Sequence, residues 1–123
     1  MSSEILVIED DAFLRDEIVD FLARRGRNVV CCESIAQADE VCQQGLKPRL
    51  ILSDIHLPDG DGVSFCVRMA DSLPMTKWVL MSGNRELVRY GTLARLPSVQ
   101  VVDKPVPLAV LARFIGALDA SPT

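Results

Sequence analysis

The chain has 123 residues, enough for one compact domain but not for two domains with separate cores. Hydrophobic residues make up 49 % of it and charged residues 24 %, a composition that supports a folded core and excludes an intrinsically disordered, collagen-like or coiled-coil protein. The 13 Lys and Arg against 17 Asp and Glu give a net charge of −4, which disfavours direct binding of nucleic acid, because phosphate contacts need a basic face.

Nothing in the sequence predicts a membrane segment or a secretory signal. Apolar runs reach about six residues, against the roughly 18 needed to span a bilayer, and the first residues, MSSEILVIEDD, are acidic rather than basic. The cysteines lack the CxxC or Cys/His spacing of a metal site and stand among apolar residues, so we expect buried thiols in a reducing cytoplasm; a vicinal disulfide is the alternative. The four are Cys31, Cys32, Cys42 and Cys66.

Short apolar runs alternate with helical periodicity along the chain, which predicts an α/β protein with a parallel sheet and crossover helices. Residues 4–8 and 28–32 are the first two predicted strands, and both are apolar enough to be covered on two faces. Between them, residues 11–25 show the i, i+4, i+7 spacing of an amphipathic helix, and Gly26 supplies a residue that can end it.

The second predicted helix opens on a capping-box pattern, Ser34 followed by Gln37, and stops at Gly45. Residues 49–53 form the third predicted strand, again without polar interruption. These elements extend the alternation of strand and helix.

The third predicted helix follows Gly62 and ends before Pro74, and residues 77–81 form the fourth strand. Residues 85–96 form the weakest of the predicted helices, because Gly91 interrupts them and their apolar positions make no clean stripe. We expect this helix to be short or mobile.

Residues 99–102 form the fifth predicted strand, and Pro107 stands at the favoured first turn of a fifth helix. Five strand and helix pairs therefore fit the length of the chain. The apolar face of the fifth helix is made by Leu108, Leu111, Ile115 and Leu118.

Polar residues follow four of the five predicted strands, where the carboxyl ends of a parallel sheet form sites. Three carboxylates gathered there would repel one another, and either raised pKa values or a hard divalent cation must relieve the repulsion. An all-oxygen ligand set favours Mg²⁺. The alternative is that the acidic run after the first strand only caps the first helix, the role we expect for Asp11. The residues are Glu9-Asp10-Asp11, Asp54, Ser82-Gly83-Asn84 and Asp103-Lys104-Pro105.

The segment from Asp54 to Gly62, DIHLPDGDG, resembles the D-x-x-[LM]-P-x-x-[DS]-G segment around the phosphoacceptor aspartate of receiver domains of bacterial two-component response regulators. The resemblance covers residues 4–119. It implies a flavodoxin-like (CheY-like) fold: a doubly wound five-stranded parallel sheet in the order 2-1-3-4-5, with five helices in three layers, as a single receiver domain over residues 1–123. The other motifs similar to that family are its acidic pair in Glu9-Asp10, its hydroxyl residue in Ser82 and its Lys-Pro pair, joined by a cis bond, in Lys104-Pro105.

The resemblance also implies a function, a phosphorylation-dependent signalling receiver that is a switch rather than an enzyme acting on a separate substrate. Asp54 would accept a phosphoryl group from a phosphohistidine of a sensor histidine kinase or phosphotransfer protein, assisted by Ser82 and Lys104. The switch would change binding to an output protein, to a fused output domain or to a second copy in a homodimer. The implied Mg²⁺ ligands are Glu9 through water, Asp10, Asp54 and the backbone carbonyl of His56.

Val101 departs from the family, which commonly has Tyr or Phe three residues before the Lys-Pro pair. Tyr90 and Trp78 are aromatic, but packing is the simpler role for both. A pseudo-receiver that binds partners without phosphorylation is therefore one alternative. An aspartyl-phosphate phosphatase is another, although haloacid-dehalogenase-type enzymes carry a second Asp where His56 stands here. His56 and Asn84 occupy positions that tune dephosphorylation in the family.

Overall fold

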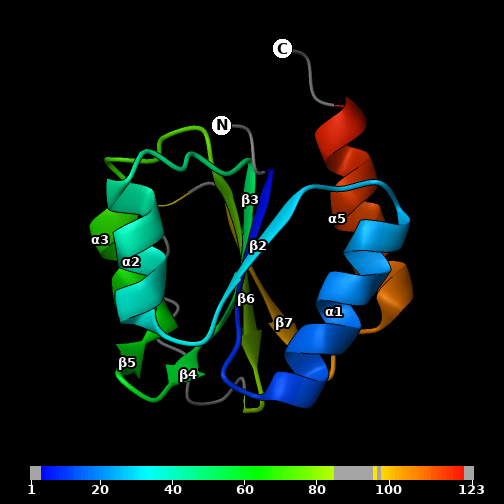
Figure 1. Ribbon diagram of the computed structural model, residues 1–123, viewed down its shortest axis with the longest axis horizontal. Coiled ribbons are helices and arrows are strands. Elements are labelled where there is room, and N and C mark those ends of the chain that lie inside the picture. The colour runs from blue at the N-terminus through cyan, green and yellow to red at the C-terminus, as the bar shows by residue number, and fades with distance from the viewer. Residues whose placement is uncertain (1–3, 85–95, 97, 121–123) are drawn as a thin grey trace.

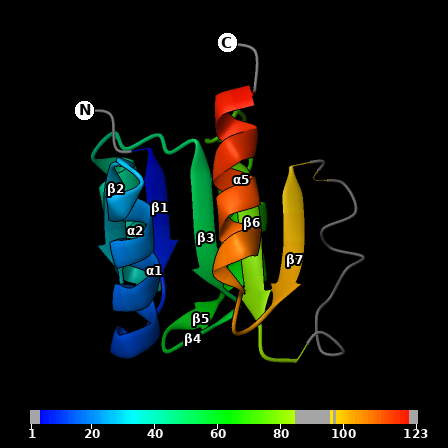
Figure 2. The same ribbon diagram turned by 90° about the vertical axis from the view of Figure 1, so that its right-hand side faces the viewer.

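The computed structural model describes residues 4–84, 96 and 98–120. In this part of the chain, five strands form one parallel sheet in the order β2-β1-β3-β6-β7. This is the predicted order 2-1-3-4-5 of the five apolar runs, because β4 and β5 form a small separate hairpin (Figure 2). The strands are β1 (Ile5–Ile8), β2 (Val29–Cys32), β3 (Leu50–Asp54), β4 (His56–Leu57), β5 (Gly60–Asp61), β6 (Lys77–Ser82) and β7 (Val99–Asp103).

The helices form the outer two of three layers. The helices α1 and α5 cover one face of the sheet and α2 and α3 the other (Figure 1, Figure 2). Most of the predicted fourth helix falls on residues 85–95, outside the described residues. Among the described residues, no helix is both long and apolar enough to cross a bilayer. The described helices are α1 (Ala12–Arg24), α2 (Ile35–Gln43), α3 (Gly62–Met69) and α5 (Leu108–Ala120).

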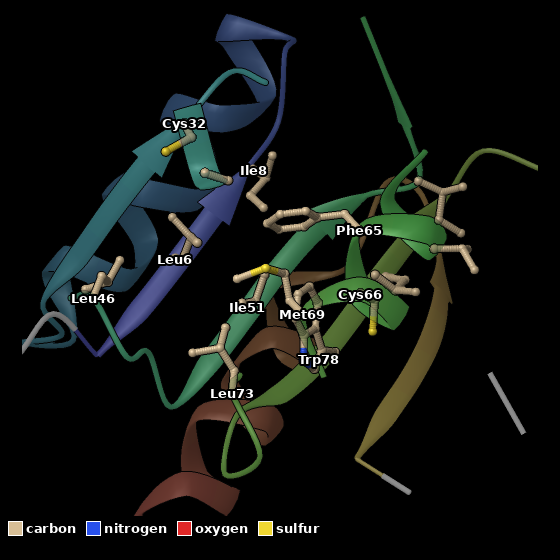
Figure 3. Packing of buried hydrophobic residues seen from close by; sticks show 14 residues of the cluster. Leu6, Ile8, Cys32, Leu46, Ile51, Phe65, Cys66, Met69, Leu73 and Trp78 are labelled. Carbon is tan, nitrogen blue, oxygen red and sulfur yellow. The ribbon is translucent and has the colours of Figure 1, made fainter. Parts of the chain in front are cut away.

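Alternate residues of the central strands feed two apolar cores, because successive strand side chains point to opposite faces. Leu6 and Ile8 face a first core cluster under α2 and α3, whereas Ile5 and Val7 face a second under α1 and α5. In the first cluster, Phe65 meets Trp78 edge to face at 5.8 Å between ring centroids (Figure 3). Packing of this kind is the role of Trp78, which is buried.

The prediction that each strand is buried on both faces is confirmed for the central strands β1, β3 and β6. It is wrong for β2 and β7, which are the edges of the described sheet. For the same reason the prediction that all cysteines are buried is wrong: Cys31 is exposed on the edge strand β2, and Cys42 is half-buried. All four thiols are free, so the alternative of a vicinal disulfide does not occur in this structure.

The third helix is shorter than predicted. It ends at Met69, because the carbonyl oxygen of this residue accepts hydrogen bonds from the amides of both Ser72 (3.1 Å) and Leu73 (2.9 Å) and the chain tightens into turns. Leu73 is nevertheless buried in the first core cluster. The apolar spacing that placed Leu73 in the predicted helix therefore reflects its burial, although the residue lies in a turn.

Candidate functional site

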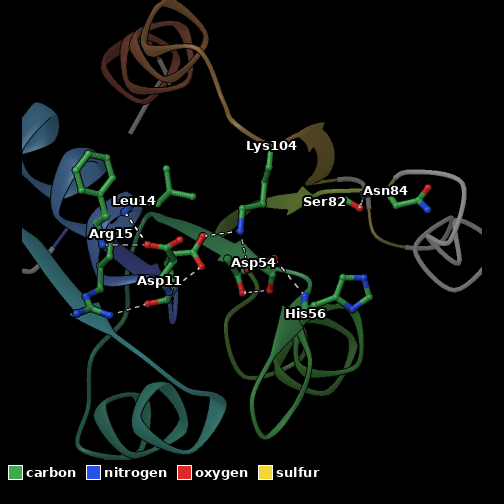
Figure 4. Close-up of polar contacts among 11 residues, drawn as sticks. Asp11, Leu14, Arg15, Asp54, His56, Ser82, Asn84 and Lys104 are labelled. Atoms are coloured by element: carbon green, nitrogen blue, oxygen red, sulfur yellow. Dashed lines mark hydrogen bonds and ion pairs between the residues drawn. The ribbon is translucent and has the colours of Figure 1, made fainter.

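The carboxyl ends of four strands converge on one edge of the sheet, and each carries a polar residue there (Figure 4). Glu9 follows β1, Asp54 ends β3, Ser82 ends β6 and Lys104 follows β7. Glu9, Asp54 and Ser82 are buried, at 0 %, 5 % and 1 % exposure, while Lys104 is half-buried. The structure therefore brings together predicted site residues that lie far apart in the sequence.

Three carboxylates form the acidic group of this site. One ligand oxygen from each of Glu9, Asp10 and Asp54 can be chosen so that all three lie within 4.8 Å of one another. Asp10 is exposed, which leaves the group open to solvent on one side. The helix-capping role falls instead on Asp11, whose carboxylate accepts from the amides of Phe13 (3.0 Å) and Leu14 (3.2 Å), so the predicted cap is confirmed.

Lys104 is the cation that faces this acidic group. Its Nζ lies 2.8 Å from Oδ2 of Asp54 and 2.9 Å from Oε1 of Glu9. Burial disfavours the charged ammonium, but the hydrogen bond to Asp54 and the ion pairs with both carboxylates outweigh burial and raise the pKa of Lys104. The backbone amide of Lys104 donates to the carbonyl oxygen of Ser82 (2.8 Å), and the bond to Pro105 is cis.

Glu9 is a carboxylate whose ionised form is disfavoured by its surroundings. Burial raises its pKa to about 7, helped by the nearby charge of Asp54 and opposed by Lys104. Its Oε1 is a buried acceptor that makes an ion pair with Lys104 but no hydrogen bond to any described residue. An under-coordinated buried carboxylate oxygen beside two further carboxylates fits a hard divalent cation such as Mg²⁺.

The backbone around Asp54 is held closely. The amide of His56 donates to Oδ1 of Asp54 (3.2 Å), and the imidazole points away from it and is exposed (Figure 4). Gly62 packs directly on this turn: a Cβ there would overlap the carbonyl oxygen of Asp54, and its amide donates to the carbonyl of Ile55 at 2.7 Å. Only glycine permits this approach.

Ser82 presents a buried hydroxyl at the end of β6. Its Oγ accepts a hydrogen bond from the amide of Asn84 (3.0 Å), so the O–H remains to donate elsewhere. On the neighbouring strand, Val101 is half-buried, pairs with Leu80 and packs on the first core cluster. Tyr90, the other aromatic considered for its place, lies outside the described residues.

Sequence reasoning missed Arg15, which lies behind the acidic group. Its Nη1 donates to the carbonyl oxygen of Glu9 at 3.0 Å (Figure 4). The same atom pairs with Glu33 at 3.5 Å. Arg15 therefore holds the backbone of the acidic pair from the first helix. The sequence carries no signal for this contact, because a backbone carbonyl is present at every position.

The family model described as the response regulator receiver domain matches residues 5–115. The sensor histidine kinase AruS of Pseudomonas aeruginosa is 30 % identical over 96 % of this chain but only 12 % of its own length. The chemotaxis protein CheY of Bacillus subtilis is 38 % identical over 52 % of this chain and 53 % of its own. Several relatives are much longer: the chain spans 32 % of a protein-glutamate methylesterase of Anaeromyxobacter dehalogenans and 12 % of the sensor protein TorS of Escherichia coli.

The fold is also shared with solved structures. The crystal structure of a CheY-like response regulator receiver domain protein from Methanospirillum hungatei superposes with a TM-score of 0.83, over 96 % of this chain and 94 % of that one, at 21 % identity. The receiver-domain family model thus covers nearly all of a chain whose fold is that of a solved CheY-like receiver domain. The chain belongs to the response regulator receiver domain family, the signalling switches of two-component systems.

Proposed function

We propose that residues 1–123 form one receiver domain that is phosphorylated on Asp54 with Mg²⁺ as cofactor. The phosphoryl donor is a phosphohistidine of a sensor histidine kinase or phosphotransfer protein. The observation that supports this most directly is the contact of the Asp54 carboxylate with Lys104, beside the carboxylates of Glu9 and Asp10. A nucleophilic carboxylate, a cation and hard oxygen ligands are together what phosphoryl transfer to an aspartate requires.

In the proposed reaction, a carboxylate oxygen of Asp54 attacks the phosphorus, the phosphorus–nitrogen bond of the donor histidine breaks and its electron pair returns to the imidazole. Asp10, Asp54 and the backbone carbonyl of His56 would hold Mg²⁺, with Glu9 acting through water, and the bound ion would supply charge neutralisation for the phosphoryl oxygens. The ammonium of Lys104 is already 2.8 Å from Asp54 and turns to a phosphoryl oxygen as the new bond forms. The product is a mixed anhydride, which water hydrolyses, so the signal is temporary.

Ser82 links this reaction to a change of shape. Its hydroxyl can donate to the phosphoryl group while it accepts from the amide of Asn84, and this pulls the loop after β6 inward. The phosphoryl group adds roughly two negative charges at neutral pH to a site with one facing lysine. We propose that the movement changes which partner the domain binds.

The output is proposed to lie in a partner protein, in a fused domain or in a homodimer. The relatives that carry a similar segment include proteins named as a sensor protein, a sensor histidine kinase, a methylesterase and a transcriptional regulatory protein, most of them several times longer than the matched segment. This variety supports a module that controls different outputs. A receiver domain of this kind needs no substrate other than its phosphoryl donor.

The test is labelling by acetyl phosphate with Mg²⁺, followed by intact mass. Wild type gains one phosphoryl group and Asp54→Asn gains none, while Asp71→Asn, in an exposed turn after α3, gains one like wild type. Equal labelling of wild type and Asp54→Asn would refute the role of Asp54.

A pseudo-receiver remains the second candidate, because Val101 is a half-buried aliphatic residue where the resemblance implies an aromatic one. Beryllofluoride with Mg²⁺ distinguishes the two, since it mimics a phosphoryl group on the carboxylate. Chemical-shift changes around Asp54 and Ser82 support the phosphorylated switch. A spectrum that does not change supports the pseudo-receiver.

A further inference from the structure

The side chain of Asp59 joins the turn between β4 and β5 to the amino end of α2. Its Oδ1 accepts a hydrogen bond from the amide of Ile35 and its Oδ2 one from the amide of Ala36, each at 2.9 Å. These are the first two amides of the helix, which have no partner within a helix. The partners are 24 and 23 residues apart in the chain, so this is a tertiary contact and not a local turn.

The helix also has a cap from its own chain, and the two caps do not overlap. Oγ of Ser34, the N-cap residue, accepts from the amide of Gln37 at 3.2 Å. Asp59 therefore takes the two amides that Ser34 does not reach. These two hydrogen bonds favour the ionised carboxylate and lower the pKa of Asp59.

An apolar contact supports the same attachment. A Cβ placed on Gly60 would come within 2.9 Å of Cδ1 of Ile35, so the backbone of the hairpin lies directly against the first helical residue. Leu57 and Ile35 both pack on the first core cluster. Figure 1 shows the hairpin below the end of α2 at which the helix begins.

The other end of the hairpin is the candidate site. Only Ile55 separates Asp54 from the first strand of the hairpin, and the amide of His56 donates to Oδ1 of Asp54. The return strand leads into Gly62, whose amide closes the loop on the carbonyl of Ile55 at 2.7 Å. A shift of the hairpin therefore moves the backbone of His56 relative to Asp54.

We propose that Asp59 is a positioning residue for the site: by binding the first two amides of α2, it fixes the hairpin and, through it, the backbone of His56 beside Asp54. The part that concerns Mg²⁺ rests on the proposed function above, because the carbonyl of His56 is one of the proposed ligands. The part that concerns the hairpin rests only on the contacts of Asp59 and Gly60.

The experiment compares Asp59→Ala with Ser34→Ala, which removes the other cap of the same helix and leaves the hairpin untouched. Urea unfolding first establishes the stability lost by each variant. Amide exchange of Gly62 is then measured by NMR without metal. Asp59→Ala speeds this exchange about fivefold, the effect of one lost cap on local opening, whereas Ser34→Ala leaves it unchanged.

The second readout is Mg²⁺ affinity by calorimetric titration. Asp59→Ala weakens binding about tenfold, as the loss of a group that orients a metal ligand does. Ser34→Ala binds like wild type, and Asp59→Asn, which keeps one acceptor oxygen, lies between. If Asp59→Ala does not fold, Asp59→Asn is compared with Ser34→Ala instead.

Equal effects of Asp59→Ala and Ser34→Ala on both readouts would overturn the proposal, because the hairpin would then depend on the stability of α2 alone. Faster exchange at Gly62 without weaker Mg²⁺ binding would overturn the link from the hairpin to the metal ligand. A wild type that binds no Mg²⁺ contradicts the proposed metal site, whereas the exchange of Gly62 still decides whether Asp59 holds the hairpin.

Discussion

Replacing Glu9 by glutamine tests the electrostatics of the candidate site most directly. Glu9 is fully buried and its pKa is raised from 4.5 to about 7, above all by burial. Between these two pH values the folded protein binds more protons at this position than the unfolded chain, so stability falls as pH rises. The loss is complete once the pH has passed the folded pKa. Glutamine has nearly the shape of the protonated acid and no charge to titrate.

The size of the effect follows from the two pKa values. A carboxyl that titrates near 7 when folded and at 4.5 when unfolded lowers the free energy of unfolding by about 3 kcal/mol at pH 8 relative to pH 4. Because glutamine does not titrate, the free energy of unfolding of Glu9→Gln does not fall in this way. Without metal, we expect the variant to match wild type near pH 5 and to be more stable by about 2 to 3 kcal/mol at pH 8.

The assay is urea unfolding followed by circular dichroism at pH 5, 6, 7 and 8 in EDTA at constant ionic strength. With a urea dependence of roughly 1 to 3 kcal/mol per molar, the expected difference at pH 8 is a midpoint shift of about 1 to 2 M. Glu17→Gln, which removes an exposed carboxylate of α1, is the matched control and keeps the pH profile of wild type. Added Mg²⁺ stabilises a folded protein that binds it. We expect the stabilisation at pH 8 to be larger for wild type than for Glu9→Gln, because the variant lacks one of the proposed carboxylates.

Parallel stability profiles of wild type and Glu9→Gln from pH 5 to pH 8 would refute the reasoning. They would mean that the contact with Lys104 lowers the pKa of Glu9 as much as burial raises it. A wild type that is the more stable of the two at pH 8 in EDTA contradicts it more strongly, since the ionised carboxylate would then stabilise the fold.

Gly62→Ala places a methyl group on the carbonyl of Asp54 and is expected to cost roughly 1 to 3 kcal/mol in urea unfolding. Gly116→Ala is the matched change in α5, where a Cβ meets nothing within 4 Å. It is expected to stabilise the protein by about 0.5 to 1 kcal/mol, and a loss of stability would contradict the assignment of this residue to a helix. Lys104→Met slows phosphorylation by acetyl phosphate roughly a hundredfold, measured by intact mass against time, whereas Lys47→Met, at an exposed position, keeps the wild-type rate.

The fold was predictable to the extent that burial leaves a pattern in the sequence. The central strands are covered on both faces and read as unbroken apolar runs, and their order follows from the resemblance. The hairpin of β4 and β5 was not predicted, because two residues per strand carry no periodicity. Leu73 was assigned to a helix because its burial, in a turn, continues the helical spacing of α3. Cys31 was assigned to the core because an apolar run does not reveal which strand is an edge.

The candidate site was predictable where it depends on residue type at strand ends. A parallel sheet brings those ends together, so Glu9, Asp54 and Lys104 could be grouped before any coordinates. Arg15 and Asp59 could not, because each binds backbone atoms of another segment. A carbonyl or an amide is present at nearly every position, and only the folded chain shows which one a side chain reaches.

The ion pair between Lys104 and Asp54 joins positions 50 apart in the chain, and Glu9 precedes both. A chain in which β7 had not docked on β6 would have the acidic group without its cation. Sheets built from such non-local pairings form slowly. Lys104 reaches the acidic group only when β7 is in place, so under the proposed function a chain without docked β7 would lack the cation on which phosphorylation of Asp54 depends.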